Sequence, residues 1–418
     1  MLLTIGYDKD LLDPTSGAAA RHREYARHFE AIHLIVFSRS EGEAETVDLG
    51  EGVYAHKTAG GSPLAVLKSA YAIGKRILEE GSVRRGMKGV ETSHAGMTPL
   101  RAQGKSVNNA EWVISTQDPF ECALVGYLLK RATGVPLQIQ EHGDFFSRPY
   151  WRQESLLNRA RYLLGRFLLP RADGVRVVSE RIKRALLARG VAEERITVVP
   201  VYTEVEEFET AAPDHGIEAL CPEGGLLVLS MARFVPQKNL CVLLRAWRAV
   251  VKEVPSARLA LVGQGAERRQ LLAHARDLMP EKVTFIDWTE NPAGAMKAAD
   301  VYALPSDYEG WGRVCVEALA AGTPLVTTDV GCVGEVVVHE ESGLVVPPRD
   351  SDALAHALVR VLRDEALRAK LKEGGVRAID TLKTKEECIA LYVESVRACA
   401  HNLPDARHPR ESNGGDPE

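Results

Sequence analysis

The sequence predicts an α/β protein made of two doubly wound, Rossmann-like domains, each with its own parallel sheet. The chain has 418 residues, which is more than one ordinary hydrophobic core accommodates. Short apolar runs alternate with amphipathic stretches along its whole length, as in parallel sheets covered by helices. An acidic stretch with Pro and Gly, residues 202–225, separates two such series and is the predicted connection.

The predicted elements follow this alternation in order. In the first half, strands are expected within residues 2–7, 32–38, 112–117, 137–143, 174–179 and 196–201. In the second half, they are expected within residues 226–232, 257–263, 283–288, 301–306, 324–329 and 343–348. Residues 239–254 and 351–374 have the apolar spacing of helices.

These elements define the domain boundaries that we expect. The first domain covers residues 1–203 and the second covers residues 204–385, followed by a helix over 386–400 that can return to the first domain. Residues 81–110 are polar and rich in Gly, so we expect a long exposed loop or an insertion there. The polar tail, residues 401–418, is expected to be disordered.

Bulk composition is that of a soluble globular protein. Apolar residues make up 45% and charged residues 26% of the chain. No run approaches the roughly 18 apolar residues of a membrane span, and the N-terminus does not resemble a secretion signal. The seven cysteines include no CxxC pair, so we expect neither a zinc site nor a disulfide framework. We therefore predict a cytoplasmic protein.

Charge is distributed unevenly between the halves. Residues 1–200 hold 28 Lys and Arg against 23 Asp and Glu, and the remaining residues hold 24 against 34. A basic first half can face an anionic membrane or an acidic ligand, while simple surface scatter is the alternative. No basic, aromatic-rich surface for nucleic acid is indicated.

Residues 151–170 are a basic stretch that could likewise face an anionic membrane. A helix there would place leucines and Phe167 on one face, with arginines along its borders. We expect this face to pack on the core while the arginine stems reach solvent. The alternative is that the helix lies on an anionic membrane surface.

The stretch from Asp307 to Gly322, DYEGWGRVCVEALAAG, is the strongest candidate site. A predicted strand precedes it, and a helix closed by Gly322 follows the glycines Gly310 and Gly312. A helix N-terminus binds anions, and glycine lets a ligand approach the backbone. Glu309 and Glu317 can each accept hydrogen bonds from a vicinal diol. Together they predict a sugar-nucleotide site; the alternative is two ordinary helix acids.

Two further stretches support this interpretation. Arg233 follows a predicted strand, and Lys238 opens the next helix, where such cations can neutralise a diphosphate. The alternative is a pair of solvated surface cations. Gly263 and Gly265 follow another strand, but this GxG lacks the third glycine and the acidic ribose ligand of a dinucleotide fingerprint. A dehydrogenase is therefore not predicted.

In combination, these motifs resemble the nucleotide-sugar domain of the retaining glycosyltransferases of family 4, which have the GT-B fold. The motifs occur in the family's order: ARFVPQKN, LALVGQGAERRQL, VTFIDW, the long stretch around Glu309 and Glu317, and ESGLVVPPRD. The resemblance covers residues 170–375 well and residues 1–150 more loosely. It implies a donor domain in the second half and an acceptor domain in the first.

The resemblance also implies roles for individual residues. Glu309 would hold donor-sugar hydroxyls near the reacting carbon, Glu317 would bind the ribose diol, and Arg233 and Lys238 would clamp the diphosphate. The backbone at Gly310, Trp311, Gly312, Arg313 and Val314 would contact the sugar and the phosphates, with Gly263 and Trp288 near the nucleotide. In the first half, Ser16 and Gly17 would lie near the diphosphate, and His142 near the donor sugar, although a lone histidine is often structural.

The sequence departs from the family at residues 201–204, VYTE, which replace Asn-Gly-Val-Asp, and at the N-terminal loop, where Gly17 precedes alanines. Arg313 replaces a residue that is often apolar. The resemblance implies a metal-independent hexosyl transfer without a cofactor, on to a glycan or lipid-linked acceptor, of a kind used in polysaccharide and cell-envelope assembly. Alternatives are a nucleotide-sugar epimerase, a phosphorylase, for which no pyridoxal-binding lysine is evident, or a non-catalytic binding protein.

Overall fold

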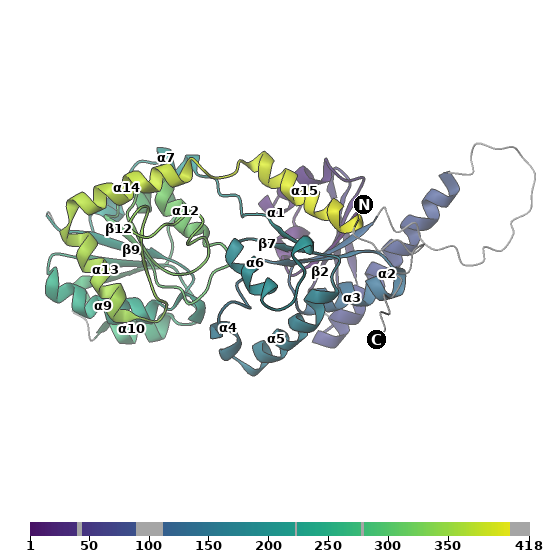
Figure 1. Cartoon of the computed structure of the whole chain (residues 1–418), viewed down its shortest axis with the longest axis horizontal. Coiled ribbons are helices and arrows are strands. Elements are labelled where there is room, and N and C mark those ends of the chain that lie inside the picture. Colours follow the sequence, from purple (N-terminus) through teal and green to yellow (C-terminus); the bar gives the residue numbers. More distant parts are fainter. Residues whose placement is uncertain (40–43, 89–111, 222–223, 277–279, 402–418) are drawn as a thin grey trace, which may run out of the picture.

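A computed structural model describes residues 1–39, 44–88, 112–221, 224–276 and 280–401. Its described residues form two α/β units side by side, with the N-terminal unit and the C-terminal unit at opposite ends of the long axis (Figure 1). The doubly wound α/β fold predicted from the sequence is confirmed, and each unit has its own predominantly parallel sheet.

The N-terminal sheet has eight strands in the order β3-β4-β2-β1-β5-β6-β7-β8. Its strands are β1 (Leu2–Gly6), β2 (Ile32–Val36), β3 (Glu45–Gly50), β4 (Val53–Lys57), β5 (Val113–Thr116), β6 (Leu137–Glu141), β7 (Gly174–Val177) and β8 (Ile196–Val198). All six strands predicted in this half are present. The hairpin β3–β4 was not predicted, and β3 is antiparallel to β4.

Helices cover both faces of this sheet. They are α1 (Gly17–Ala26), α2 (Pro63–Lys88), α3 (Glu121–Thr133), α4 (Tyr150–Gln153), α5 (Leu156–Leu168) and α6 (Glu180–Leu187), with short 3-10 turns at Lys9–Leu12, Leu169–Arg171 and Glu193–Arg195. The loop expected to begin at residue 81 is wrong for residues 81–88, because α2 continues to Lys88. The rest of that segment, residues 89–110, lies outside the described residues.

The C-terminal sheet has six parallel strands in the order β11-β10-β9-β12-β13-β14. Its strands are β9 (Leu227–Met231), β10 (Arg258–Val262), β11 (Val283–Ile286), β12 (Val301–Leu304), β13 (Leu325–Thr328) and β14 (Leu344–Val346). The surrounding helices are α7 (Glu206–Thr210), α8 (His215–Glu218), α9 (Leu240–Glu253), α10 (Arg268–Arg276), α11 (Pro292–Lys297), α12 (Arg313–Ala320), α13 (Ser351–Arg363) and α14 (Glu365–Ile379), with 3-10 turns at Pro236–Lys238 and Pro280–Lys282. Every strand predicted in this half is present.

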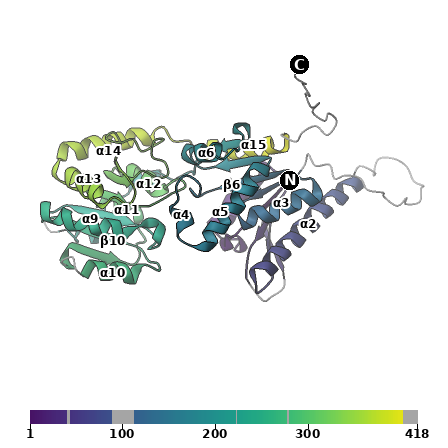
Figure 2. The same ribbon diagram turned by 60° about the horizontal axis from the view of Figure 1, so that its bottom comes forward.

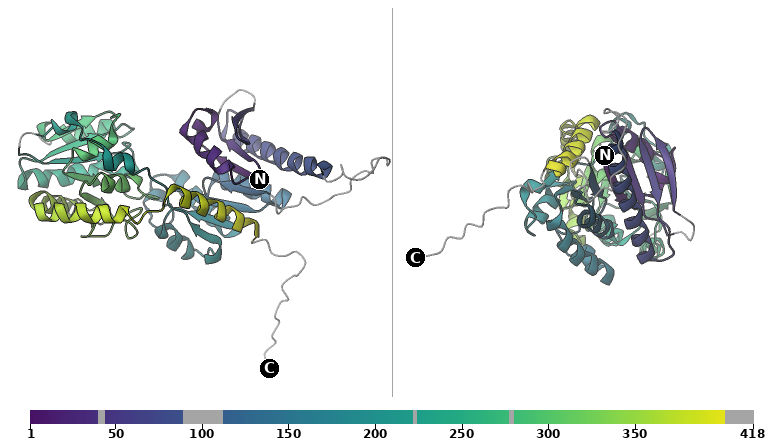
Figure 3. Two further views of the ribbon diagram at one scale, coloured as in Figure 1. Left: turned by 90° about the horizontal axis from the view of Figure 1, so that it is seen from above. Right: turned by 90° about the vertical axis from the view of Figure 1, so that its right-hand side faces the viewer.

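The last helix, α15 (Lys385–His401), returns to the N-terminal unit and packs beside β5 and β7 (Figure 3). Lys385 forms an ion pair with Glu24 of α1 at 2.6 Å. Inside the interface, the Gln138 amide donates to the Ser395 hydroxyl at 3.1 Å. The chain therefore crosses between the units twice, once near residue 200 and once before α15. The tail, residues 402–418, lies outside the described residues.

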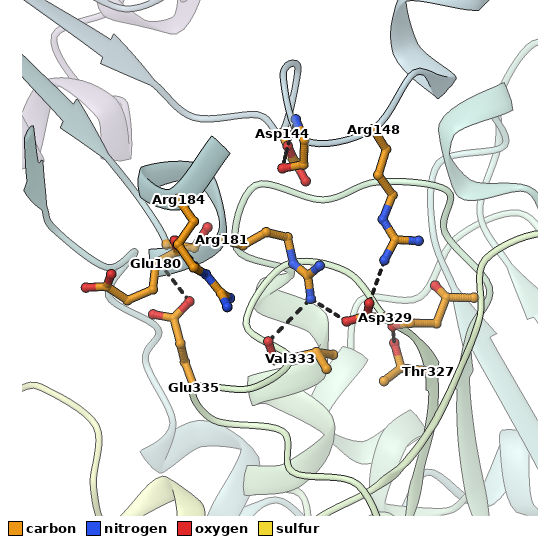
Figure 4. A network of polar contacts seen from close by, with 12 residues as sticks. Asp144, Arg148, Glu180, Arg181, Arg184, Thr327, Asp329, Val333 and Glu335 are labelled. Carbon is orange, nitrogen blue, oxygen red and sulfur yellow. Dashed lines mark hydrogen bonds and ion pairs between the residues drawn. The ribbon is translucent and has the colours of Figure 1, made fainter. Parts of the chain in front are cut away.

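Polar contacts join the two units around Asp329, which follows β13 (Figure 4). Its carboxylate accepts from Arg148, at 2.5 Å, and from Arg181 of α6, so two arginines of the N-terminal unit hold one carboxylate of the C-terminal unit. Nearby, the Glu180 backbone amide, at the start of α6, donates to the Glu335 carboxylate at 2.9 Å. These contacts hold the two units against one another.

The α5 helix differs from expectation. Its core-facing side is formed by Gly165 and Leu168, which are buried, whereas the leucine-rich face is turned about a quarter of a circle away from the core. Leu156 is 78% exposed and Leu163 is 64% exposed. The prediction that this face packs on the core is therefore wrong for Leu156, Leu157, Leu163 and Phe167, whereas Leu164 and Leu168 do pack on it. The side with Gly165 fits against Phe146 instead.

Candidate active site

The candidate site lies where the C-terminal sheet changes direction. From β9 the chain winds outward through β10 to β11, and it then returns to β12 on the other side of β9 before winding outward to β14. Helices leaving adjacent strands in opposite directions open a crevice at the carboxyl ends of those strands. Lys238 follows β9 and Glu309 follows β12, so the fold places both at this crevice.

Glu309 is held in place by three side chains. Its Oε1 accepts from Lys238 Nζ at 2.6 Å and from the Ser306 hydroxyl at 2.6 Å, and its Oε2 is 3.3 Å from the Gln237 amide nitrogen. The residue is only 7% exposed. Glu309 is thus a fixed acceptor at the end of β12.

Glu317 lies eight residues further along, about one turn into α12. Its carboxylate forms an ion pair with Arg313 at 3.2 Å, and its side chain is 15% exposed. Burial raises the pKa of Glu317 above its usual range, while Arg313 and Lys238 lower it in part. Because Lys238 acts electrostatically on Glu317 and is bonded to Glu309, it is the cation near both predicted diol acceptors.

Arg233 lies on the loop after β9, and its side chain is exposed. The loop is shaped by Gly263, which has φ 143° and packs against the Ala232 carbonyl, where a Cβ atom would overlap. Gly263 therefore supports the backbone beside Arg233. Its predicted place near the nucleotide stays a prediction.

The glycine-rich turn brings the two units together. Gly310 packs directly against the backbone carbonyl of His142, which follows β6 of the N-terminal unit. Trp311 is buried, and its carbonyl accepts from the Cys332 amide at 2.7 Å. Gly312 is the N-cap of α12 at φ 78°, so the first helical residues, Arg313 and Val314, direct their amides toward the crevice.

His142 lines a cavity of about 830 Å³ in the N-terminal unit. Its Nε2 lies 3.0 Å from the Gln117 side-chain oxygen. Burial, and then the charges of Arg176 and Arg21, lower the pKa of His142 to about 3. The side chain lines the cavity, and the lowered pKa leaves the imidazole neutral at ordinary pH.

The cavity is bounded by the carboxyl ends of the N-terminal strands, by α1 and by α15, and Arg313 reaches it from the C-terminal unit. Gly17, Gln117 and Asp118 also line it. Two of its cations, Arg21 and Arg176, form no ion pair among the described residues, and the Arg176 Nε is buried without a hydrogen-bond partner there. The cavity thus combines a neutral histidine with two guanidinium groups that have no carboxylate partner among the described residues, and Arg176 donates to the Gln140 side-chain oxygen at 2.6 Å.

Two predicted residues do not join these groups. The Ser16 hydroxyl is the N-cap of α1, accepting from the Ala19 amide at 3.1 Å and lying 2.6 Å from the Asp10 carbonyl. Trp288 is 77% exposed after the edge strand β11. The structure therefore shows a structural role for Ser16 and leaves Trp288 open to solvent.

Asp307 and Arg349 were not identified from the sequence. The Asp307 carboxylate accepts from Asn239 at 2.7 Å and from two nitrogens of Arg349 at 2.6 and 2.8 Å. The Arg349 guanidinium also stacks on the ring of Tyr150 at 4.0 Å, across the boundary between the units. Asp307 itself was the only sequence signal for this contact. Its partner Arg349 is 42 positions away, so the sequence did not indicate the pair.

Comparison with known proteins agrees with this geometry. Residues 217–377 match the family "Glycosyl transferases group 1", and residues 110–201 match the "Glycosyl transferase 4-like domain". The structure resembles that of Anabaena HepE in complex with UDP, with a TM-score of 0.67, 17% identity and coverage of 94% of this chain and 97% of that one. Sucrose-phosphate synthase from Thermosynechococcus elongatus has a TM-score of 0.67 at 22% identity, covering 94% and 98% of the two chains.

Three curated relatives are similar in sequence. The lipopolysaccharide core biosynthesis glycosyltransferase LpsD of Rhizobium meliloti is 34% identical over 47% of this chain and 56% of its own. The phosphatidyl-myo-inositol mannosyltransferase of Mycobacterium leprae is 39% identical over 38% and 43%. The D-inositol 3-phosphate glycosyltransferase of Saccharomonospora viridis is 30% identical over 66% and 68%. The matches span about half the length of the first two relatives.

The two sheets, the crevice at β9 and β12 and these matches define a GT-B fold of the glycosyltransferase type. The chain belongs to the group 1 glycosyltransferases. The resemblance drawn from the motifs around Glu309 and Glu317 is thereby confirmed at the level of family and fold.

Proposed function

We propose that the protein is a hexosyltransferase that moves a sugar from a nucleoside-diphosphate sugar to a hydroxyl of a glycan or lipid-linked acceptor, with retention of configuration. The observation on which this rests is Lys238, which is bonded to Glu309 and acts electrostatically on Glu317 beside the N-terminus of α12. The names of the relatives, which include lipopolysaccharide and phosphatidylinositol glycosyltransferases, support this class of reaction.

In the proposed mechanism, protein groups stabilise the charge that develops on the leaving diphosphate. Arg233, Lys238 and the free amides at the start of α12 are the available donors, and such preorganised donors are a large contribution to catalysis. Glu309 would accept from the donor-sugar hydroxyls and Glu317 from the ribose diol. The proposal needs neither a metal ion nor a cofactor, since side chains and the helix N-terminus supply the positive charge.

Retention implies that the acceptor attacks on the face that the diphosphate leaves. A leaving phosphate oxygen would then take the proton of the acceptor hydroxyl, and the neutral imidazole of His142 would lie near the donor sugar without carrying charge. A covalent intermediate on Glu309 is the minor alternative. The acceptor would enter the cavity beside His142, and closure of the units would exclude water. We place the reaction on the cytoplasmic side of a membrane.

The first experiment is a thermal-shift panel of UDP-, GDP- and ADP-sugars on the wild type and on Glu317→Ala. One nucleotide class should raise the melting temperature of the wild type, and raise that of the variant less, because a ligand that binds the native state stabilises it by mass action. Glu373→Ala, an exposed acid on α14, is the matched control. No shift with any sugar nucleotide at millimolar concentration would contradict the proposal.

Donor affinity should also depend on pH through Glu317. Its folded-state pKa is raised, chiefly by burial, so the carboxylate becomes protonated at a higher pH than an ordinary glutamate does. The protonated form accepts fewer hydrogen bonds from the ribose, so affinity should weaken as pH falls through that raised pKa. Calorimetry with the intact sugar nucleotide measures this, because its diphosphate stays ionised. Glu317→Gln should flatten the profile, and an unchanged pH dependence in that variant would rule out Glu317 as the cause.

A further inference from the structure

The α5 helix exposes an apolar face that the other described parts of the chain cover only in part, through Tyr127 and Arg171 at Phe167. Leu156, Leu157, Leu163 and Phe167 are 78%, 56%, 64% and 45% exposed. A globular protein tolerates single exposed leucines, but four large side chains on a helix of 13 residues form a patch that typically marks an interaction site. We define the α5 face as Leu156, Leu163 and Phe167 with Arg159 and Arg166; Leu157 lies at its border, on the side of buried Leu168.

This face is distinct from the side of α5 that belongs to the core. Gly165 lies on the inner side, where a Cβ atom would meet the Phe146 ring at 2.7 Å, and Leu168 is fully buried. At 100° per residue, Leu156, Leu163 and Phe167 fall within a narrow sector on the opposite side. Leu156 and Leu163 therefore contribute little to packing within the described part of the chain.

The charged residues within α5 are all cations. The helix contains three arginines and no acidic residue. Arg159 and Arg166 are exposed, and neither has a carboxylate partner among the described residues. At the end of the helix, the Arg171 guanidinium stacks over Phe167 at 3.8 Å. Unpaired cations around protruding leucines are complementary to a surface that is anionic outside and apolar beneath.

The position of α5 connects this face to the candidate site. Helices α4 and α5 lie along the edge of the N-terminal unit that adjoins the C-terminal unit (Figures 1 and 2). Just before α5, Glu154 accepts from the Tyr308 hydroxyl at 2.8 Å, and Tyr308 directly precedes Glu309. A surface bound to α5 would thus be held beside the junction of the two units.

We propose that the α5 face docks the protein on an anionic lipid bilayer, with the leucines and Phe167 in the interfacial layer and the arginines at the lipid headgroups. The helix has 13 residues, and none of the described helices is long and apolar enough to cross a bilayer, so the contact is interfacial. This inference does not depend on which sugar the protein transfers, or on whether it transfers one.

The test is sedimentation of the full chain with phosphatidylcholine vesicles and with mixed phosphatidylcholine–phosphatidylglycerol vesicles at low salt. We expect binding to the mixed vesicles that weakens as salt is added. Leu156→Glu combined with Leu163→Glu should weaken binding by at least about tenfold, since each leucine loses its transfer free energy. Arg159→Glu combined with Arg166→Glu should weaken it by roughly fivefold per arginine or more.

Two control variants introduce the same kinds of substitution at exposed positions outside the α5 face. Val376→Glu alters an apolar residue that is 49% exposed on α14, and Arg269→Glu alters an exposed arginine on α10. Both should bind vesicles like the wild type. Thermal melts check that the α5 variants stay folded, as their exposure leads us to expect.

Three results would overturn the proposal. They are absence of the wild type from every vesicle pellet, binding by the α5 variants equal to that of the wild type, and conversion of a wild-type dimer to a monomer by the leucine variant in light scattering. The last would identify the α5 face as a contact between two copies of this chain. A failed sugar-nucleotide panel would leave the vesicle result unaffected, so the two proposals fail separately.

Discussion

Replacing Glu309 with glutamine is expected to lower kcat by about a thousandfold, which is near the upper range for removing one preorganised electrostatic group. The change keeps the size of the side chain and its ability to accept from Ser306, but it removes the charge opposite Lys238. Turnover is measured as hydrolysis or transfer of the sugar nucleotide that the thermal-shift panel identifies. The expected loss is in kcat, because we propose that this carboxylate holds the donor-sugar hydroxyls during transfer.

Stability must be separated from turnover in this experiment. Removing one partner of a buried ion pair can cost about 3–5 kcal/mol, because the other charge remains buried and unpaired. The Lys238 side chain is 15% exposed, so the loss of stability on removing its partner is expected to be smaller than this. Glu373→Gln, at an exposed ion pair, is the control for a lost carboxylate. A folded Glu309→Gln protein that keeps kcat within tenfold of the wild type would exclude the proposed role.

Replacing Gly310 with alanine is expected to lower kcat by about a hundredfold, because misplacing reacting groups by roughly 1 Å costs that much. A Cβ atom at this position would overlap the His142 carbonyl of the other unit, so the two units must separate at the candidate site. The radius of gyration from small-angle scattering should rise. The melting temperature should change little, since neither hydrophobic core is altered.

Two variants test whether separation is the cause. Gly216→Ala, on α8, adds a Cβ atom that meets only the Asp214 side chain, and it should have no effect. Asp329→Asn removes the charge that Arg148 and Arg181 share, loosening the same boundary without touching the crevice, and it should lower kcat less than Gly310→Ala. An unchanged scattering profile and full activity in Gly310→Ala would contradict the proposed closure.

The central elements of this protein were predictable because their signals are local. Each parallel strand is an apolar run flanked by turn residues, and all twelve predicted strands are present. The hairpin β3–β4 was missed because Glu45–Gly50 is largely exposed at the sheet edge and lacks an apolar run. The motif around Glu309 could be located because a strand, glycines and a helix start follow one another within a few residues.

The arrangement of the site depended on contacts between distant segments. The ion pair of Lys238 with Glu309 exists because β9 and β12 are neighbours in the sheet, although 71 positions separate the two residues. The hydrogen bond of Arg349 to Asp307 and the contact of Gly310 with the His142 carbonyl also join segments that are distant in sequence. Ser16 has the residue type that a ligand site needs, but its hydroxyl serves the end of α1. Residue type alone does not distinguish these uses.

By itself, the sequence determined the α/β class, the two units, the family and the two glutamates, because strand patterns and short motifs act over short distances. Only the tertiary structure decided which partners surround those glutamates and which face of α5 packs. The periodicity of residues 156–168 shows an apolar face without showing what lies opposite it, and burial is a property of the neighbours. Leu156, Leu157 and Leu163 are exposed because Gly165 fits against Phe146 more closely than a leucine can.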